Sequence, residues 1–264
     1  MSNKKYTLKE VTDKALEREF IELPKRLYKG NRNWVCPLDD DIKAVFDPAK
    51  NKLYQDGEAI RWVAYNAEGE VVGRIAAFYD NEHAYSYEQP TGGCGFFEAI
   101  NDQELANMLF DAARMWLVSR GMEAMEGPVT FGPRDAWWGL LVEGYEFQPL
   151  YANPYNPPYY KELFETYGFQ NYFNQNTYLW RVYDDDINGM IHERAKRLMN
   201  TPRFQLRTYQ RKGFGVGSRE FPCDLQQGME SLYRCEAYAK GRGSADYEDS
   251  APYRRSKHHL LCIL

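Results

Sequence analysis

The stretch AIRWVAYNAEGEVVGRIAAFY (residues 59–79) decides the fold class. Its first seven residues alternate in character with the two-residue period of a strand, and one face carries Ile60, Trp62 and Ala64. Asn66–Gly69 has the composition of a turn, and residues 70–79 form a second apolar run. Two such runs joined by a short turn predict a β-hairpin.

A long helix is predicted from Asn101 to Arg120. Its apolar face recurs every three or four residues, at Leu105, Leu109, Ala112 and Trp116. Asn101 and Glu104 have the spacing of a capping box, and Gly121 is a natural stop.

A second helix is predicted near the N-terminus, from Thr12 or Asp13 to about Lys29. Pro24 lies inside this helix, and proline removes a backbone donor. We therefore expect a break or kink near Leu23.

The remaining segments complete an alternating order of strands and helices. Strands are predicted at Tyr6–Val11, Gly92–Ile100, Met122–Thr130 and Tyr172–Val182, and helices at Leu38–Phe46, Ala136–Val142 and Pro157–Tyr167. The expected class is α/β (α+β), with a mixed central sheet flanked by helices.

Composition excludes several classes of function. The chain has 264 residues, with 33 Lys and Arg against 38 Asp and Glu and no basic stripe, so nucleic acid is not an expected partner. The N-terminus has no apolar leader and no window approaches the ~18 apolar residues of a membrane span, so we expect a cytoplasmic protein. The five cysteines lack CxxC spacing, and no metal site is predicted.

Three segments carry a resemblance to a known family. They are the hairpin motif Gly69–Gly73, the strand–helix unit Phe96–Gly121, and Tyr159–Phe169 with its final Gly-Phe step. They resemble the GNAT superfamily of acyl-CoA N-acyltransferases. Longer motifs are similar to a bacterial two-module branch of that superfamily: Asn33–Val35, Asp47–Asn51, Val72–Ala77, Gly127–Pro128 and Pro154–Tyr160. The resemblance implies a GNAT-like domain over residues 1–183.

The resemblance also implies acyl-CoA as a co-substrate, held where a strand leads into the long helix. In the family, a glycine-rich loop there offers backbone N–H groups to the pyrophosphate. This cofactor-binding site is carried over to Phe97, Ala99, Asn101, Gln103 and Leu105. The turn here has no glycine, and Asp102 and Glu104 would repel a pyrophosphate. A carboxylate already on those amides, with no cleft beside them, would exclude CoA from this turn.

An N-acyl transfer needs a base for the attacking amine and an acid for the leaving thiolate. Glu98 is the candidate base, because burial on an apolar strand would raise its pKa. The resemblance implies Tyr167 as the acid, with Tyr160 on the same helix as the reserve. A solvent-facing glutamate and packed tyrosines are the structural alternatives.

The proline-rich segment NPYNPPY (residues 153–159) is the candidate substrate-binding wall. Its amides and phenols can hydrogen-bond a polar ligand, and the residues concerned are Asn153, Tyr155, Asn156 and Tyr159. The alternative is a rigid connector whose amides satisfy its own backbone.

The sequence changes character after residue 183. Residues 184–214 are predicted to hold a connecting helix (Ile187–Met199) and the first strand (Phe204–Tyr209) of a second GNAT-like module. Residues 215–264 lose amphipathic periodicity, and we expect a non-homologous tail without packed elements. Reading the codons of this tail one nucleotide further gives a string with amphipathic helices. We therefore hypothesise a frame shift near Gly215 that truncates the second module.

Three functions follow as hypotheses. The first is an acyl-CoA-dependent N-acyltransferase acting on a small amine or amino acid. The second is a non-catalytic GNAT-like binding or scaffold module. The third is a substrate-binding half whose CoA half is the second module. An apolar face left by an incomplete module would favour a homodimer.

Overall fold

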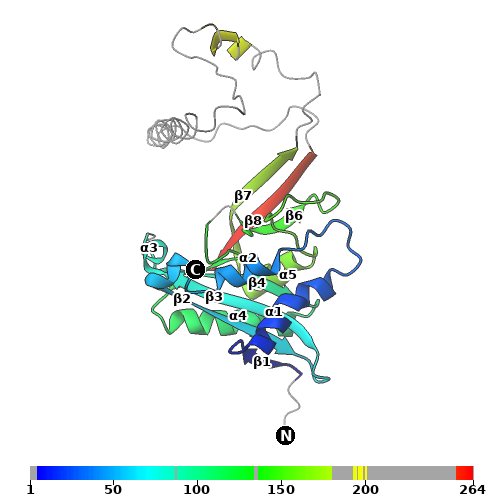
Figure 1. Cartoon of the computed structure of the whole chain (residues 1–264), viewed down its shortest axis with the longest axis vertical. Helices are drawn as coiled ribbons and strands as arrows, with labels where there is room; N and C mark the ends of the chain where they lie inside the picture. The colour runs from blue at the N-terminus through cyan, green and yellow to red at the C-terminus, as the bar shows by residue number, and fades with distance from the viewer. Residues whose placement is uncertain are drawn as a thin grey trace, which may run out of the picture. The chain divides into compact units, whose positions relative to one another are not determined.

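The computed structural model describes residues 5–86, 88–133 and 136–179, the backbone of 254–263, and residues 193–194, 196–198 and 200. The chain divides into two units, one of residues 1–179 with 254–264 and one of residues 180–253. All the labelled helices and strands belong to the first unit (Figure 1).

One mixed sheet forms the centre of the first unit. Its strands are β1 (Thr7–Glu10), β2 (Gly57–Tyr65), β3 (Val71–Asp80), β4 (Thr91–Ala99), β5 (Ala124–Gly127), β6 (Leu140–Glu143), β7 (Gln170–Leu179) and β8 (Arg254–Ile263). The order is β1-β2-β3-β4-β5-β8-β6, and β7 pairs with β8. β4 and β5 pair in parallel and the other pairs are antiparallel, so the predicted mixed sheet and the β2–β3 hairpin are confirmed.

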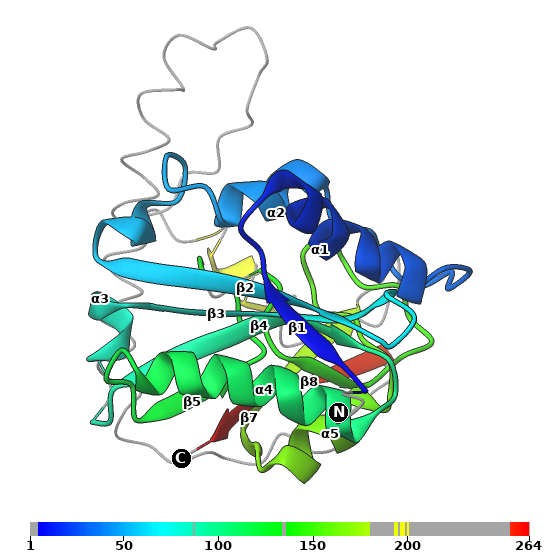
Figure 2. The ribbon, with the colours of Figure 1, turned by 90° about the horizontal axis from the view of Figure 1, so that it is seen from below.

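Helices cover both faces of this sheet. They are α1 (Lys14–Leu27), α2 (Asp39–Val45), the 3-10 helix η1 (Lys52–Gln55), α3 (Asn81–Ala84), α4 (Gln103–Val118) and α5 (Tyr160–Tyr167). Figure 2 shows α4 on one side of strands β2 to β4 and α1 and α2 on the other. Two hydrophobic cores result, and alternate residues of the strands supply one core or the other.

Helix α1 continues through Pro24 to Leu27, and the predicted break near Leu23 is wrong. Pro24 has no N–H for the carbonyl of Phe20, four residues earlier. Nη1 of Arg74 on β3 donates to that carbonyl instead, over 2.6 Å. The side chain of Asp13 caps the helix start, as the sequence predicts.

Helix α4 begins at Gln103, and its cap is Asp102, one residue after the predicted cap Asn101. The Asp102 carboxylate accepts from the Leu105 amide over 3.1 Å and pairs with Nζ of Lys5 over 2.6 Å. Asp is as good an N-cap as Asn, and Lys5 of the N-terminal segment adds a charge partner that lies far away in sequence. Gly121 ends the helical segment with a φ of 83°.

Two other predictions are wrong. A helix was predicted over Ala136–Val142, but Leu140–Glu143 is strand β6, because Trp137 and Gly139 both have positive φ and break a helix there. The tail was predicted to lack packed elements, but its residues 254–263 form strand β8, whose backbone pairs with β5, β6 and β7. The ladder satisfies backbone groups regardless of side-chain pattern.

A bulge in β4 decides which way its side chains point. Arg74 of β3 lies opposite Glu98, whereas Ala76 lies opposite Gly95, so Phe96 and Phe97 together face one residue. Phe96 has a φ of 52°. One extra residue reverses the faces of all residues after it. Glu98 therefore faces the α1 side of the sheet, where Arg74 also points.

Just before this bulge, β4 and β5 separate. Their parallel pairing covers only Thr91–Gly93 of β4, and the last backbone bond between the two segments runs from the Val129 amide to the Cys94 carbonyl. Gly95 allows this close approach, since a Cβ there would overlap the carbonyl oxygen of Val129. The separation leaves room for a pocket.

Candidate functional site

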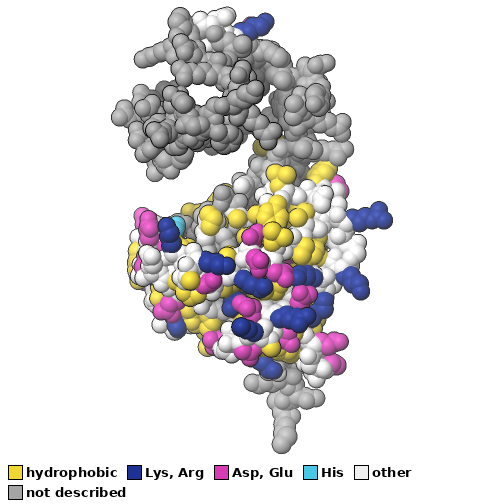
Figure 3. All heavy atoms as spheres, viewed as in Figure 1, with side chains coloured by type: hydrophobic (Ala, Val, Ile, Leu, Met, Phe, Trp, Pro, Cys, Tyr) yellow, Lys and Arg dark blue, Asp and Glu magenta, His cyan; other side chains and the backbone are white. Residues whose placement is uncertain are grey.

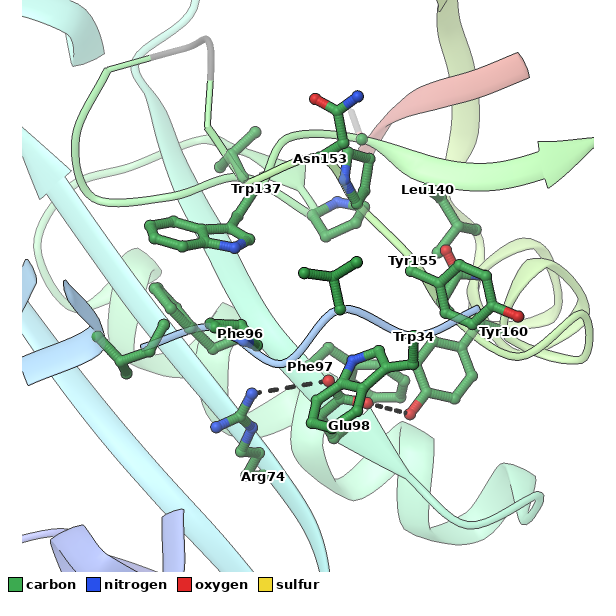
Figure 4. A pocket seen from close by; sticks show the side chains of 18 of the residues that line it. Trp34, Arg74, Phe96, Phe97, Glu98, Trp137, Leu140, Asn153, Tyr155 and Tyr160 are labelled. Carbon is green, nitrogen blue, oxygen red and sulfur yellow. Dashed lines mark hydrogen bonds and ion pairs between the residues drawn. The ribbon is translucent and has the colours of Figure 1, made fainter. Parts of the chain in front are cut away.

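A pocket opens between the diverging ends of β4 and β5, with about 750 Å³ of empty space including its mouth. Its walls come from six parts of the chain (Figure 4). The N-terminal and sheet walls are the α1–α2 connection with the start of α2 (Trp34, Val35, Pro37, Ile42), β3 (Arg74) and β4 (Phe96, Phe97, Glu98). The other walls are the segment from β5 to the start of β6 (Pro128, Val129, Trp137, Gly139, Leu140), residues 153–156 and α5 (Tyr160, Phe164). The walls are mainly apolar and aromatic, with few polar groups, which is the usual make-up of a small-molecule site.

Glu98 lies at the floor of this pocket with its side chain 12% exposed. Its Oε2 accepts hydrogen bonds from the hydroxyls of Tyr160 over 2.8 Å and Tyr28 over 2.9 Å. Its Oε1 lies 3.6 Å from Nη2 of Arg74. The carboxylate is thus held by three side chains from α1, β3 and α5.

Burial raises the pKa of Glu98, against the opposing effects of Arg74 and the two tyrosines, which favour the charged form. Burial, with the nearby Glu98 charge, holds the pKa of Tyr28 and Tyr160 well above the usual value of a phenol. Both phenols therefore stay protonated at neutral pH, as hydrogen-bond donors to the carboxylate.

Arg74 is the charge partner and is itself 5% exposed. Its guanidinium lies 4.6 Å from the centre of the Phe20 ring and donates to the Phe20 carbonyl that Pro24 leaves free. The proline of α1 therefore helps to hold the arginine beside Glu98.

The structure brings Glu98 and Tyr160 together, as the sequence interpretation of a shared site requires. Tyr167, the predicted acid, lies elsewhere. Its hydroxyl donates to Asp111 on α4 over 2.8 Å, and Tyr167 does not line the pocket. Among the candidate tyrosines, Tyr160 is the one within reach of Glu98.

Internal partners occupy most of the groups predicted to bind CoA. The Ala99 amide donates to the Tyr160 hydroxyl and the Ala99 carbonyl accepts from Tyr159, while Asp102 holds the Leu105 amide. Nε2 of Gln103 donates to the Leu163 carbonyl and to Asn107, and Asn101 is exposed.

Of these candidates only Phe97 lines the pocket, and no residue of 99–105 does. The start of α4 carries its own acidic cap, so it does not fit a pyrophosphate.

Part of the proline-rich segment lines the pocket and part of it bonds to neighbouring backbone. Asn153, Tyr155 and Asn156 line the pocket, whereas Tyr159 does not. The buried Asn156 side chain is used internally, because it accepts from the Leu141 amide over 2.7 Å and donates to the Leu141 and Pro157 carbonyls. Of the two asparagine side chains in this segment, that of Asn153 lines the pocket without the internal bonds that Asn156 makes.

The sequence analysis does not name three residues of this site: Trp34 and Arg74, which line the pocket, and Tyr28, which bonds to Glu98. The rings of Tyr28 and Trp34 stack with centroids 4.9 Å apart beside Glu98. Trp34 and Arg74 belong to motifs that carry the family resemblance, so the sequence could have indicated them as site residues. Nothing in the sequence indicates Tyr28 as a site residue, apart from its place at the end of a predicted helix.

Other kinds of site find no support in the part of the chain that is described. No group of three or more His, Cys, Asp or Glu residues there is arranged to hold a metal ion. No described helix has the length and apolar character needed to cross a bilayer. On the face in Figure 3, basic and acidic side chains are intermixed.

No family model matches the chain. The protein YghO of Escherichia coli (strain K12) is 33% identical over 156 residues, which are 58% of this chain and 38% of that protein. The bacterial ceramide synthase of Caulobacter vibrioides is 30% identical over 185 residues, which are 68% of this chain and 45% of that protein. The chain thus spans less than half the length of these curated relatives.

Solved structures similar to the chain include a tandem GNAT protein from the clavulanic acid biosynthesis pathway. It is 12% identical, with a TM-score of 0.45 over 66% of this chain and 47% of that one. The order of elements around the mixed sheet, with the hairpin β2–β3, the strand–helix unit β4–α4 and the late α5–β7 unit, agrees with the order that the sequence predicts. The described domain has a mixed α/β fold.

Proposed function

We propose that the chain is part of an N-acyltransferase-type protein, and that its described domain holds the amine that receives the acyl group. The observation that carries this proposal is Glu98, a buried carboxylate at the floor of a largely apolar pocket, with a pKa raised by burial. A base for an amine must bind the ammonium form and then accept its proton. A carboxylate with a raised pKa suits both steps.

In the proposed reaction the amine lies on Glu98. The ammonium gives one proton to Glu98, the freed amine nitrogen forms a bond to the acyl carbon, and the bond from that carbon to the thiolate of the acyl donor breaks. A second proton of the nitrogen goes to the thiolate, which leaves as a thiol, and one proton stays on the amide nitrogen. Tyr28 and Tyr160 hold the carboxylate in place through Oε2, and Oε1, which lies 3.6 Å from Arg74, receives the proton.

The acyl donor is expected to bind elsewhere than at the start of α4. Asp102 caps that turn from within, and no pocket residue lies there. Both curated relatives are more than twice as long as the part matched, and we propose that the donor site belongs to such a further part. One relative is named a ceramide synthase, and a ceramide contains an N-acyl bond.

The test is amide formation. The chain, and a longer version with the reading frame restored near Gly215, are incubated with acetyl-CoA and longer acyl-CoAs and a panel of amines, and products are measured by mass spectrometry. Glu98→Gln should lower kcat/KM by about 10²–10⁴-fold. Glu123→Gln, an exposed glutamate outside the pocket, should leave it unchanged. No amide from either protein, or full activity of Glu98→Gln, would contradict the proposal.

A non-catalytic binding module is the second candidate. The self-capped start of α4 favours it, because a domain without a pyrophosphate loop need not bind CoA at all. Calorimetry with acyl-CoA separates the two candidates: a longer version that binds amines but no acyl-CoA would be a binding module.

A further inference from the structure

An apolar loop forms part of the rim of the pocket. The stretch WVCPL (residues 34–38) has five apolar residues in succession, and none of them is buried. Val35 and Pro37 line the pocket, whereas Leu38 is 62% exposed. Exposed apolar runs of this length reduce solubility, so a run that is kept on the surface of a domain usually has a function.

A second loop continues this apolar surface. Leu150 and Tyr151 are 72% and 46% exposed. The Tyr151 hydroxyl accepts from the Leu38 amide over 3.0 Å, so the two loops lie side by side. The Tyr151 ring packs edge-on against Trp137, with ring centroids 6.2 Å apart, and Trp137 lines the pocket (Figure 4). Leu38, Leu150 and Tyr151 therefore form one exposed apolar patch beside the pocket, here named the rim patch.

The charges near the rim patch are unevenly paired. The three acids after Leu38 have partners within the chain: Asp39 with Lys25, Asp40 with Lys43, and Asp41 with the Tyr151 hydroxyl. Lys29 and Arg32, which precede the first loop, are exposed and have no acidic partner in the described part of the chain. Glu146, near the second loop, is an exposed acid without a described partner. The unpaired cations thus outnumber the unpaired acid, which suits a surface that carries negative charge.

A lipid surface fits the rim patch better than a protein partner does. A stable protein interface takes about 20–30 residues a side, far more than the rim patch offers. A protein bound there would also close the pocket. A bilayer accepts a few apolar side chains into its interface and, because it is fluid, leaves the pocket open to molecules dissolved in it.

We propose that the rim patch docks on the surface of a bilayer that contains anionic lipids. Leu38, Leu150 and Tyr151 enter the interface, and Lys29 and Arg32 lie against the head groups. A tyrosine is suited to this depth, because its ring is apolar and its hydroxyl is polar. This inference goes beyond the proposed function, since docking needs neither an amine nor an acyl donor.

Co-sedimentation of the full chain with vesicles tests the docking. The vesicles contain either phosphatidylcholine alone or phosphatidylcholine mixed with phosphatidylglycerol, which is anionic. The wild-type chain should bind the mixed vesicles. Replacing both leucines, Leu38→Ser with Leu150→Ser, should weaken this binding about tenfold or more, because each leucine then no longer gains from leaving water.

Met115→Ser with Val118→Ser is the matched control. These residues are 69% and 62% exposed, much like the two leucines, but they lie on α4, on the other side of the sheet from α1 and α2 (Figure 2). This double variant should bind the mixed vesicles as the wild type does.

A charge variant tests the anionic part of the proposal. Arg32→Gln should weaken binding to the mixed vesicles about fivefold, which is the usual effect of one basic side chain near an anionic surface. It should leave binding to phosphatidylcholine vesicles unchanged. Arg18→Gln, at an exposed position of α1 outside the rim, should change neither.

Hydrogen exchange provides a readout on the wild-type chain. The amides of residues 34–38 and 150–153 should exchange more slowly when mixed vesicles are present, whereas those of residues 103–118 should keep their rate. Three results would overturn the inference: no binding of the wild type to mixed vesicles, equal binding of the leucine double variant, or self-association of the wild type that this variant abolishes. The last result would make the rim patch an interface between copies of the chain. Because no amine or acyl donor is present, a failure of acyl transfer would contradict the proposed function and leave this inference standing.

Discussion

At the scale of single residues, the site depends on one carboxylate and the three side chains that hold it. Tyr28 and Tyr160 both donate to Oε2 of Glu98, and Arg74 lies beside Oε1. Replacing a buried arginine or glutamate would leave an uncompensated charge, which is costly. Replacing one tyrosine hydroxyl changes only the balance between the charged and neutral forms of the carboxyl group.

Tyr28→Phe should therefore move the pH dependence of the reaction. Burial raises the pKa of Glu98, and the Tyr28 hydrogen bond opposes this because it favours the charged form. Loss of the hydroxyl raises that pKa further. The base is active when ionised, so kcat/KM falls as the pH drops through the pKa. The midpoint of this fall should rise by about one to two pH units, because a hydrogen bond to a charged group contributes about 1.5–3 kcal/mol and one pH unit corresponds to about 1.4 kcal/mol.

The same midpoint can be followed by titrating the Glu98 carboxyl carbon by NMR. Tyr155→Phe is the control, since its hydroxyl accepts from Nδ2 of Asn31 over 3.0 Å and does not contact Glu98. A midpoint that stays in place in Tyr28→Phe would show that this hydroxyl does not tune the carboxyl group.

At the scale of elements, the pocket exists because β4 leaves β5 after Cys94 and then carries a bulge at Phe96 and Phe97. Gly95 is the position where both events meet, since the Val129 carbonyl lies where a Cβ would be. Gly95→Ala should push the two segments apart and destabilise the fold by about 3 kcal/mol, at the upper end of the usual cost of overpacking. Gly132→Ala is the matched control, because its Cβ would meet only a Thr130 methyl at 3.7 Å. Chemical denaturation measures both, and equal stability of the two variants would contradict this account.

The elements that the sequence predicts well are those with a strong period or a clear cap. The β2–β3 hairpin, α1 with its Asp13 cap, and α4 with its Gly121 stop belong to this group. The bulge at Phe96 and Phe97 is harder to predict, because two adjacent aromatic residues in a strand are compatible with either face. Glu98 was proposed from its apolar surroundings, but Arg74 and Tyr28 reach it through a bulge and a helix end, and no local pattern encodes these contacts.

At the scale of the whole molecule, the two faces of the sheet have separate roles. The face under α4 and α5 is a continuous apolar core, whereas the α1 and α2 face holds Arg74 and Glu98 next to its own core. The predicted second module over residues 184–214 and the frame-shift hypothesis near Gly215 fall almost wholly outside the described residues. The described positions 193–194 and 196–198, inside the predicted helix Ile187–Met199, are helical.

The proposed function puts the amine site in the described domain and the acyl-donor site in a further part of the protein, and this gives a prediction at this scale. The chain as it stands should bind the amine substrate, since Glu98, Arg74 and the apolar walls all lie within residues 34–164. It should bind acyl-CoA weakly or not at all, because Asp102 occupies the amide that a pyrophosphate would need and Glu104 adds a second negative charge. A longer version, with one nucleotide inserted or deleted near Gly215, should bind both ligands.

Calorimetry on the two proteins, with the same amine and the same acyl-CoA, checks each part of this expectation. Equal amine affinities place the amine site in the described domain, because that domain is common to both proteins. Asp102→Asn provides the control for the donor site: it retains the helix cap but removes one charge, so acyl-CoA binding to the short chain should not appear. Tight acyl-CoA binding to the short chain would place the donor site in the described domain after all. If no single insertion or deletion in the encoding DNA restores a second module, the frame-shift hypothesis is wrong. The proposed amine site is unaffected by that result.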